Sequence, residues 1–153
     1  MSLFNTPYET QVFRFKPSDF LNNAHVAACY IRYDNKYLLL HRAVGKAQEL
    51  TWGVPAGKVE AGESSREAVV RETLEETGIR LNNNTLRDLG ILYIRYPHVD
   101  FTYHMFAQDF TCEPAVILSD EHHAYAWVSM CDLDKLPLIS GAREAFLYVQ
   151  EAG

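Results

Sequence analysis

The segment GKVEAGESSREAVVRETLEETGI, residues 57–79, contains the signals from which the fold can be inferred. It predicts a helix over residues 65–77. Ser64 and Glu67 have the spacing of a capping box, which closes the first turn of a helix, and Gly78 is a typical C-terminal stop. The residues before the helix form a loop with a glycine at each end. The stretch therefore predicts a loop that leads directly into a helix.

Three carboxylates converge on one side of this helix. At about 100° per residue, Glu75 and Glu76 lie about 60° and 40° to either side of Glu72, so we expect all three to face the same volume. The opposite side carries Val70 and Thr73 and is expected to pack on the core. The helix should therefore have one functional face and one packed face.

The position of these glutamates is unfavourable for stability. Glu75 and Glu76 occupy the last helical turn, where the helix dipole is negative, and Glu72 repels both of them. A solvated acidic face is the plain alternative. A divalent cation would relieve the repulsion, and ligands that are all oxygen favour Mg²⁺ or Mn²⁺ over zinc. The pattern indicates a metal site.

The same stretch resembles the Nudix box, G-x5-E-x7-R-E-U-x-E-E-x-G-U, in which U is a bulky aliphatic residue. Eight of the nine specified positions match, and Thr73 is the exception. The resemblance implies an α/β (α+β) fold, the family's α/β/α sandwich with a mixed, largely antiparallel sheet, over about residues 13–149. It also implies hydrolysis of the diphosphate linkage in a nucleoside diphosphate joined to another group X, with Mg²⁺ or Mn²⁺ as cofactor.

The resemblance further implies a set of metal ligands. Glu72, Glu75 and Glu76 match the family's ligands, and the family often adds the backbone carbonyl of the residue before the first box glycine, here Ala56. Many members carry one more glutamate on a loop before a late aromatic strand, and Glu121 is the candidate here. Either Glu72 or Glu121 would be the catalytic base that accepts a proton from the attacking water.

Other polar residues surround Glu121. Asp120 and Glu113 are the alternative acidic candidates in this region. His122 and His123 invite a metal interpretation, but adjacent side chains on an extended segment point to opposite faces, so both are not expected to bind one ion. We expect both histidines to be exposed to solvent.

The remaining matched positions of the box are structural in the family: Gly57, Glu63, Arg71 and Gly78. Glu63 and Arg71 would form a buried ion pair that ties the loop to the helix. Lys58 matches a loop lysine that can approach a substrate phosphate. Arg42 occupies a frequent basic position before the box and is the second candidate for substrate binding, with an exposed arginine at a strand end as the alternative.

The substrate is less well defined than the reaction. We favour a modified or ordinary nucleoside triphosphate; ADP-ribose, a nucleotide sugar or a dinucleoside polyphosphate is the alternative. Tyr96 and Pro97 lie near positions that carry a tyrosine in some diadenosine-polyphosphate hydrolases and a proline in some ADP-ribose hydrolases of the family. These two residues therefore do not distinguish between the two substrate classes. From other classes, a noncatalytic nucleotide-sensing Nudix module tends to lose the box glutamates, and an isopentenyl diphosphate isomerase needs a cysteine and glutamate context that we do not find.

The rest of the chain predicts strands on both sides of the box and a final helix. We expect strands at residues 8–16, 25–33, 36–41, 51–54, 86–96, 101–110 and 125–129, and a helix over 140–151. Asp34 and Asn35 form the turn of a β-hairpin. Residues 1–153 are expected to form a single domain, in which residues 1–7 are a poorly ordered N-terminal extension.

Composition excludes several classes of protein. The chain has 153 residues, of which 48% are hydrophobic and 22% charged, and a formal net charge of −6, which disfavours nonspecific nucleic-acid binding. Its apolar runs are too short for a membrane helix. Three cysteines without C-x-x-C spacing predict neither a disulfide framework nor a zinc site and fit a cytoplasmic protein. The expected partner is a small nucleotide, and nothing in the sequence predicts the oligomeric state.

Overall fold

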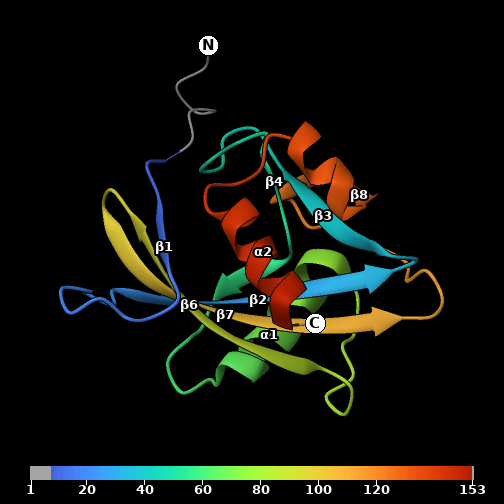
Figure 1. Ribbon diagram of the computed structural model, residues 1–153. Coiled ribbons are helices and arrows are strands. Elements are labelled where there is room, and N and C mark those ends of the chain that lie inside the picture. Colours follow the sequence, from blue (N-terminus) through green and yellow to red (C-terminus); the bar gives the residue numbers. More distant parts are fainter. Residues whose placement is uncertain (1–7, 153) are drawn as a thin grey trace.

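A mixed sheet with a helix on each face forms the fold (Figure 1). The computed structural model describes residues 8–152, so the predicted extension at residues 1–7 lies outside the described residues. The strands are β1 (Gln11–Phe13), β2 (Ala24–Tyr33), β3 (Lys36–Arg42), β4 (Trp52–Gly53), β5 (Ala56–Lys58), β6 (Arg87–Tyr96), β7 (Val99–Phe110) and β8 (His122–Val128). The helices are α1 (Ser65–Thr77), the short 3-10 helix η2 (Met130–Lys135) and α2 (Ala142–Ala152).

The sheet has the order β1-β6-β7-β2-β3-β4, with β5 paired to β2 and β8 paired to β3. Strands β2 and β7 run parallel over ten residue pairs, whereas the other pairings between named strands are antiparallel. This arrangement confirms the expected mixed, largely antiparallel sheet.

The β2–β3 hairpin opens out soon after its turn. Asp34 and Asn35 both have positive φ, 52° and 59°, the backbone conformation that a two-residue hairpin turn of this twist requires. The two strands pair only next to the turn, and β3 then continues alongside β4 and β8. Farther along β2, β5 takes the place of β3. The sheet therefore divides into two branches beside β2, and residues from both branches line the cavity described below.

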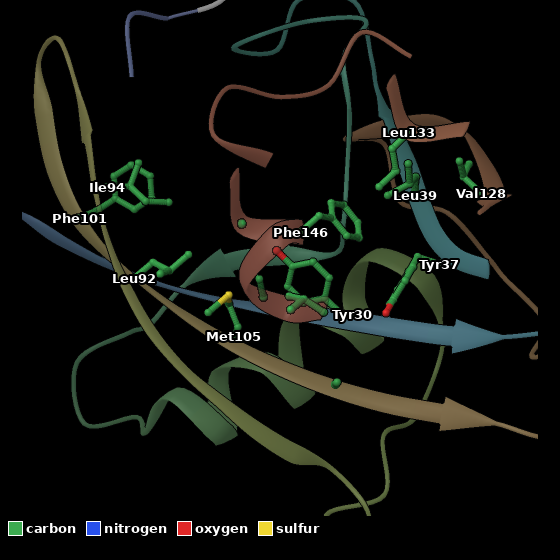
Figure 2. Packing of buried hydrophobic residues seen from close by; sticks show 14 residues of the cluster. Tyr30, Tyr37, Leu39, Leu92, Ile94, Phe101, Met105, Val128, Leu133 and Phe146 are labelled. Carbon is green, nitrogen blue, oxygen red and sulfur yellow. The ribbon is translucent and has the colours of Figure 1, made fainter. Parts of the chain in front are cut away.

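Each face of the sheet carries its own hydrophobic core. On one face, the ring of Phe146 in α2 packs edge-on against Tyr30 and Tyr37, at centroid distances of 5.0 and 5.3 Å (Figure 2). On the other face, Ala68 and Val69 of α1 pack in a second cluster. Alternate residues of β2 belong to opposite clusters, as the period of two in a strand requires. The predicted α/β/α sandwich is thus confirmed.

Helix α1 has the predicted bounds and caps. The Ser64 hydroxyl accepts from the backbone N–H of Glu67, whose carboxylate accepts from the backbone N–H of Ser64. Gly78 ends the helix with a φ of 73°, in the left-handed region that glycine enters at little cost. Thr73, the mismatch in the box, is fully buried in the packed side of the helix.

Other boundaries differ from expectation. Strand β5 replaces part of a predicted loop: it has three residues and includes a glycine, so its pairing with β2 and not local propensity defines it. Strand β8 begins at His122, three residues before the predicted start. Strand β1 is much shorter than predicted, and η2 was not predicted. Among the described residues, no helix is long and apolar enough to cross a membrane.

Candidate metal centre

A cavity of about 620 Å³ lies between α2 and the two branches of the sheet. Two sets of side chains line it. The charged and titratable set consists of Arg42, Lys58, Glu76, His98, Glu121 and His122. The aromatic set consists of Tyr30, Tyr96, Phe101, Tyr103 and Phe146. The cavity therefore offers both ionic and aromatic contacts to one ligand.

Glu76 is a buried acid at the wall of this cavity. Only 3% of the residue is exposed, although the helix prediction placed it on the open face of α1 together with Glu72 and Glu75. Its Oε1 accepts a hydrogen bond of 3.0 Å from the backbone N–H of Ala56. Burial, followed by the nearby carboxylates of Glu72 and Glu121, raises the pKa of Glu76 to about 8. A neighbouring cation would favour the ionised form of this acid.

Three potential ligand groups converge at Glu76. A carboxylate oxygen of Glu76, a carboxylate oxygen of Glu121 and a ring nitrogen of His122 all lie within 4.8 Å of one another. His122 Nδ1 lies 3.6 Å from Glu76 Oε2 and has no hydrogen-bond partner among the described residues. The structure thus brings two of the predicted ligands together with a histidine that was not predicted as one.

The expected exposure of His122 is wrong. The residue is 7% exposed, whereas His123 is exposed and its Nε2 lies 2.6 Å from His41 Nδ1. The reason is that β8 pairs with β3 as far back as His122, so the segment is part of the sheet and not a loop. The two rings do diverge, as predicted. The sequence pattern predicts that this strand begins at Tyr125 and therefore places His122 in an exposed loop.

Glu72 lies against the backbone of β5. A Cβ atom placed on Gly57 would lie 2.0 Å from Glu72 Cδ, so the glycine leaves the room that this carboxylate occupies. Burial raises the pKa of Glu72, while a hydrogen bond of 2.8 Å from Arg71 Nη1 to Oε1 opposes that effect. One carboxylate oxygen is therefore held by Arg71.

The ion pair between Arg71 and Glu63 is present and has a bidentate geometry. Arg71 Nε donates to Glu63 Oε2 at 2.8 Å, and Nη2 donates to Oε1 at 2.9 Å. Nη2 also donates to the backbone carbonyl of Lys58 at 3.0 Å. The side chains are partly buried, and hydrogen bonds from Arg71 lower the pKa of Glu63 to about 2. The arginine thus joins the loop to α1.

The remaining predicted residues are less closely engaged. The side chain of Glu75 is 57% exposed and lies 3.4 Å from Arg71 Nη1, outside the group of three convergent ligands. Lys58 is exposed at the cavity rim. Arg42 lines the cavity, and its Nε donates to the carbonyl of Ala47 at 2.6 Å. Glu113 and Asp120, the alternatives to Glu121, are not among the described residues that line the cavity.

The donor set fits a divalent cation. Glu76 and Glu121 supply carboxylate oxygens, Glu72 adds negative charge nearby, and the buried Nδ1 of His122 has a lone pair to offer in the appropriate tautomer. Burial and the carboxylates of Glu72 and Glu121 raise the pKa of Glu76, and a divalent ion would supply positive charge that stabilises its ionised form. The backbone N–H of Ala56 donates to Glu76, so the backbone of Ala56 lies beside this acid, and its carbonyl stays a predicted ligand.

A hydrogen-bond network on another wall of the cavity was not predicted. Tyr96 donates its hydroxyl proton to the carbonyl of Ser140 at 2.8 Å. Gln48 Oε1 accepts from the backbone N–H of Ser140 at 2.8 Å, and its Nε2 donates to the Tyr96 hydroxyl at 3.4 Å. These residues come from three distant segments, so no local pattern in the sequence indicates the contact.

Comparisons with known proteins agree on one family. The NUDIX domain family matches residues 23–149. A Bacillus subtilis (strain 168) protein described as an uncharacterized Nudix hydrolase, YvcI, is 32% identical over 120 residues, which cover 76% of this chain and 72% of that protein. The Mus musculus bis(5'-nucleosyl)-tetraphosphatase [asymmetrical] is 33% identical over 84 residues, 52% of this chain and 56% of that protein. The crystal structure of a MutT protein from Methanosarcina mazei Go1 superposes with a TM-score of 0.71 and 27% identity, covering 84% of this chain and 94% of that one.

Proposed function

The chain belongs to the NUDIX domain family of hydrolases, and from that premise we propose that it hydrolyses the diphosphate linkage of a modified or ordinary nucleoside triphosphate with the aid of Mg²⁺ or Mn²⁺. One observation carries the proposal: the convergent acids and the aromatic rings line the same cavity of about 620 Å³. A cavity of that size is typical of sites for ligands as large as a nucleotide.

Two basic residues of the cavity lining and a cation held by two of its acids would bind the phosphates. Glu76 and Glu121 would hold the divalent cation, with the carbonyl of Ala56 as a backbone ligand and with Glu75, which lies outside the convergent group, as the further ligand that the family resemblance implies. Arg42 and Lys58, the basic residues of the cavity lining, would contact phosphate oxygens directly. When bound, the cation supplies charge neutralisation and orientation of a water for attack on phosphorus.

Glu72 is the base that we propose for the attacking water. Its Oε1 accepts from Arg71, which fixes the carboxylate and leaves Oε2 to accept the proton. Burial raises the pKa of Glu72, and a more basic carboxylate takes the proton more readily. Gly57 keeps the space for this carboxylate beside β5. Glu121, which belongs to the convergent group, would then act as a metal ligand.

The aromatic set would bind the base or the group X. Tyr96, Phe101 and Tyr103 are the rings of the β6–β7 hairpin that line the cavity, and an aromatic face is suited to stacking on a nucleobase. Hydrolysis of a dinucleoside polyphosphate is the second candidate. The position of Tyr96 in the cavity lining and the similarity to the mouse tetraphosphatase favour it.

The location that we propose is the cytoplasm. Cys29 is buried and Cys112 and Cys131 are exposed, and all three are free thiols. Exposed free thiols are typical of proteins that remain in a reducing compartment. The net charge of −6 supports a small nucleotide and not a nucleic acid as the partner.

A substrate panel tests the function. Nucleoside triphosphates, modified triphosphates, dinucleoside polyphosphates, ADP-ribose and nucleotide sugars are incubated with the protein and Mg²⁺ or Mn²⁺, and products are separated by chromatography. We expect a nucleoside triphosphate to give a nucleoside monophosphate and inorganic diphosphate. We expect no product in the presence of EDTA and none from the Glu72→Gln variant. Turnover of ADP-ribose or a nucleotide sugar alone would overturn the triphosphate assignment, and turnover of no compound by the cation-loaded protein would overturn the proposed activity.

A further inference from the structure

His122 has no role in the proposed reaction, yet its position is unusual for a histidine. The side chain is about 95% buried, and Nδ1 has no hydrogen-bond partner among the described residues. An unpaired buried polar atom costs free energy, since water no longer solvates it. A ligand that this atom would bind offsets that cost.

The distance to Glu76 is unsuitable for a hydrogen bond and suitable for two ligands of one ion. His122 Nδ1 and Glu76 Oε2 are 3.6 Å apart, beyond the usual donor–acceptor range. Two ligand atoms at ~2.1 Å from one ion are at most ~4.2 Å apart. The 3.6 Å between Nδ1 and Oε2 lies below this limit. A carboxylate oxygen of the exposed Glu121 completes a group whose atoms lie within 4.8 Å of one another, and binding of one ion would draw them closer together.

The pairing of β8 with β3 positions the imidazole. His122 pairs with Arg42, whereas Ala124 pairs with His41, so the register shifts at this point and His123 has no partner in β3. Such β-bulges redirect side chains at the edge of a site.

We propose that His122 Nδ1 is a ligand, beside Glu76 and Glu121, of the divalent cation in this site, and that it makes the site selective for Mn²⁺ over Mg²⁺. The inference rests on the cation site of the proposed function. Imidazole nitrogen suits transition metals, whereas Mg²⁺ prefers oxygen ligands and retains its waters. A site with two carboxylates and one imidazole therefore favours the transition metal.

Binding of Mn²⁺ alone tests the inference without any substrate. Electron spin echo spectra of the Mn²⁺-loaded protein detect nitrogen coupled to the metal, and labelling the histidines with ¹⁵N identifies it as imidazole. Calorimetry gives the affinities for Mn²⁺ and Mg²⁺ separately. His122→Gln is the variant, and His123→Gln is the matched control because it changes the adjacent, exposed histidine. His98→Gln controls for the other histidine in the cavity lining.

We expect imidazole coupling in the wild type and in both controls, and none in His122→Gln. The affinity for Mn²⁺ should fall by about tenfold or more in His122→Gln, while the affinity for Mg²⁺ changes by less than about threefold. Equal losses for both ions, or coupling that survives in His122→Gln, would overturn the inference. The wild-type spectrum decides even if the variant does not fold, because bound Mn²⁺ without imidazole coupling refutes it. A wild type that hydrolyses nucleotides but lacks the coupling would refute the ligand and leave the proposed function intact.

Discussion

Glu76 is the residue whose burial has the clearest thermodynamic consequence. A carboxyl whose pKa is raised by folding, here from 4.5 to about 8, lowers stability progressively as the pH rises from the first value to the second. We therefore expect the melting temperature of the cation-free protein to fall between pH 5 and pH 8. Glu76→Gln retains an oxygen for the Ala56 N–H and cannot ionise, so it should melt several degrees above the wild type at pH 8 and close to it at pH 5. Thermal melts in EDTA at pH 5 and pH 8 measure the pH dependence of the wild type and its difference from the variant.

The control for that experiment is Glu75→Gln, because Glu75 is exposed. Its melting temperature should follow the wild type at every pH. Glu76→Gln should also lose at least two orders of magnitude in turnover, since a cation ligand is removed. An equal pH dependence in Glu76→Gln and the wild type would contradict the burial argument.

Glu121 is exposed at the cavity and, on our assignment, binds the cation and not the proton of the attacking water. Glu121→Gln should lower kcat, and a higher concentration of Mg²⁺ or Mn²⁺ should restore part of the rate, because a weakened metal site can still be filled. Titration of the cation at saturating substrate measures this. Asp120→Asn is the control and should retain the wild-type rate. A loss of kcat that no cation concentration restores would transfer the role of base to Glu121.

At the scale of secondary-structure elements, Arg71 joins the loop before α1 to the helix itself. Arg71→Ala leaves Glu63 without its bidentate partner and frees the carbonyl of Lys58, so both activity and melting temperature should fall, the latter by several degrees. The contribution of Glu63 to the free energy of unfolding is present above about pH 4.5 and is lost as the pH falls toward about 2, where this carboxyl takes up its proton. The difference in melting temperature between Arg71→Ala and the wild type should therefore become smaller at acidic pH, as thermal melts at several pH values would measure.

Arg143 offers a matched control for the ion pair. It pairs with Asp134 on the surface, where both side chains are largely exposed. Exposed pairs contribute little to stability, so Arg143→Ala should leave the melting temperature and the activity nearly unchanged. An inactive Arg71→Ala protein with wild-type stability would show that the arginine acts on the substrate and not on the loop.

The elements that the sequence predicts well are those whose signals are local. The bounds of α1 follow from its two caps, and the β2–β3 turn follows from two residues that tolerate positive φ. Strand β5 and the first residues of β8 could not be predicted in this way, because only pairing with β2 and β3 makes them strands. The burial of His122 depends on that pairing, so its exposure was misjudged.

At the scale of the whole molecule, the cavity depends on segments that are far apart in the sequence. Gln48, Tyr96 and Ser140 meet at one wall and hold a loop, the β6–β7 hairpin and the approach to α2 together. Tyr96→Phe keeps the ring and removes the hydroxyl. We expect KM to rise several-fold with little change in kcat, because the wall of the cavity loosens while the charged set is unaffected.

Steady-state kinetics on the best substrate of the panel measure the effect. Tyr93→Phe, in the same strand but absent from the cavity lining, is the control and should retain the wild-type constants. A large fall in kcat with unchanged KM would place Tyr96 in the reaction itself. The box residues could be predicted from spacing along a helix, whereas this wall could not, because its contacts arise only when the chain has folded.

The parallel pairing of β2 with β7 also bears on how the chain reaches its native state. His25 and Thr102, partners in that register, are 77 positions apart in the chain, and the whole of α1 lies in the loop that their pairing closes. Contacts between such distant positions form slowly, because the entropy of closing the loop is lost before the pairing stabilises it. Helix α1 can acquire its caps early, since they are local. The acids and the imidazole, however, come together only when β2, β3 and β8 have assembled, so cation affinity should emerge late in refolding, after most helical structure has formed.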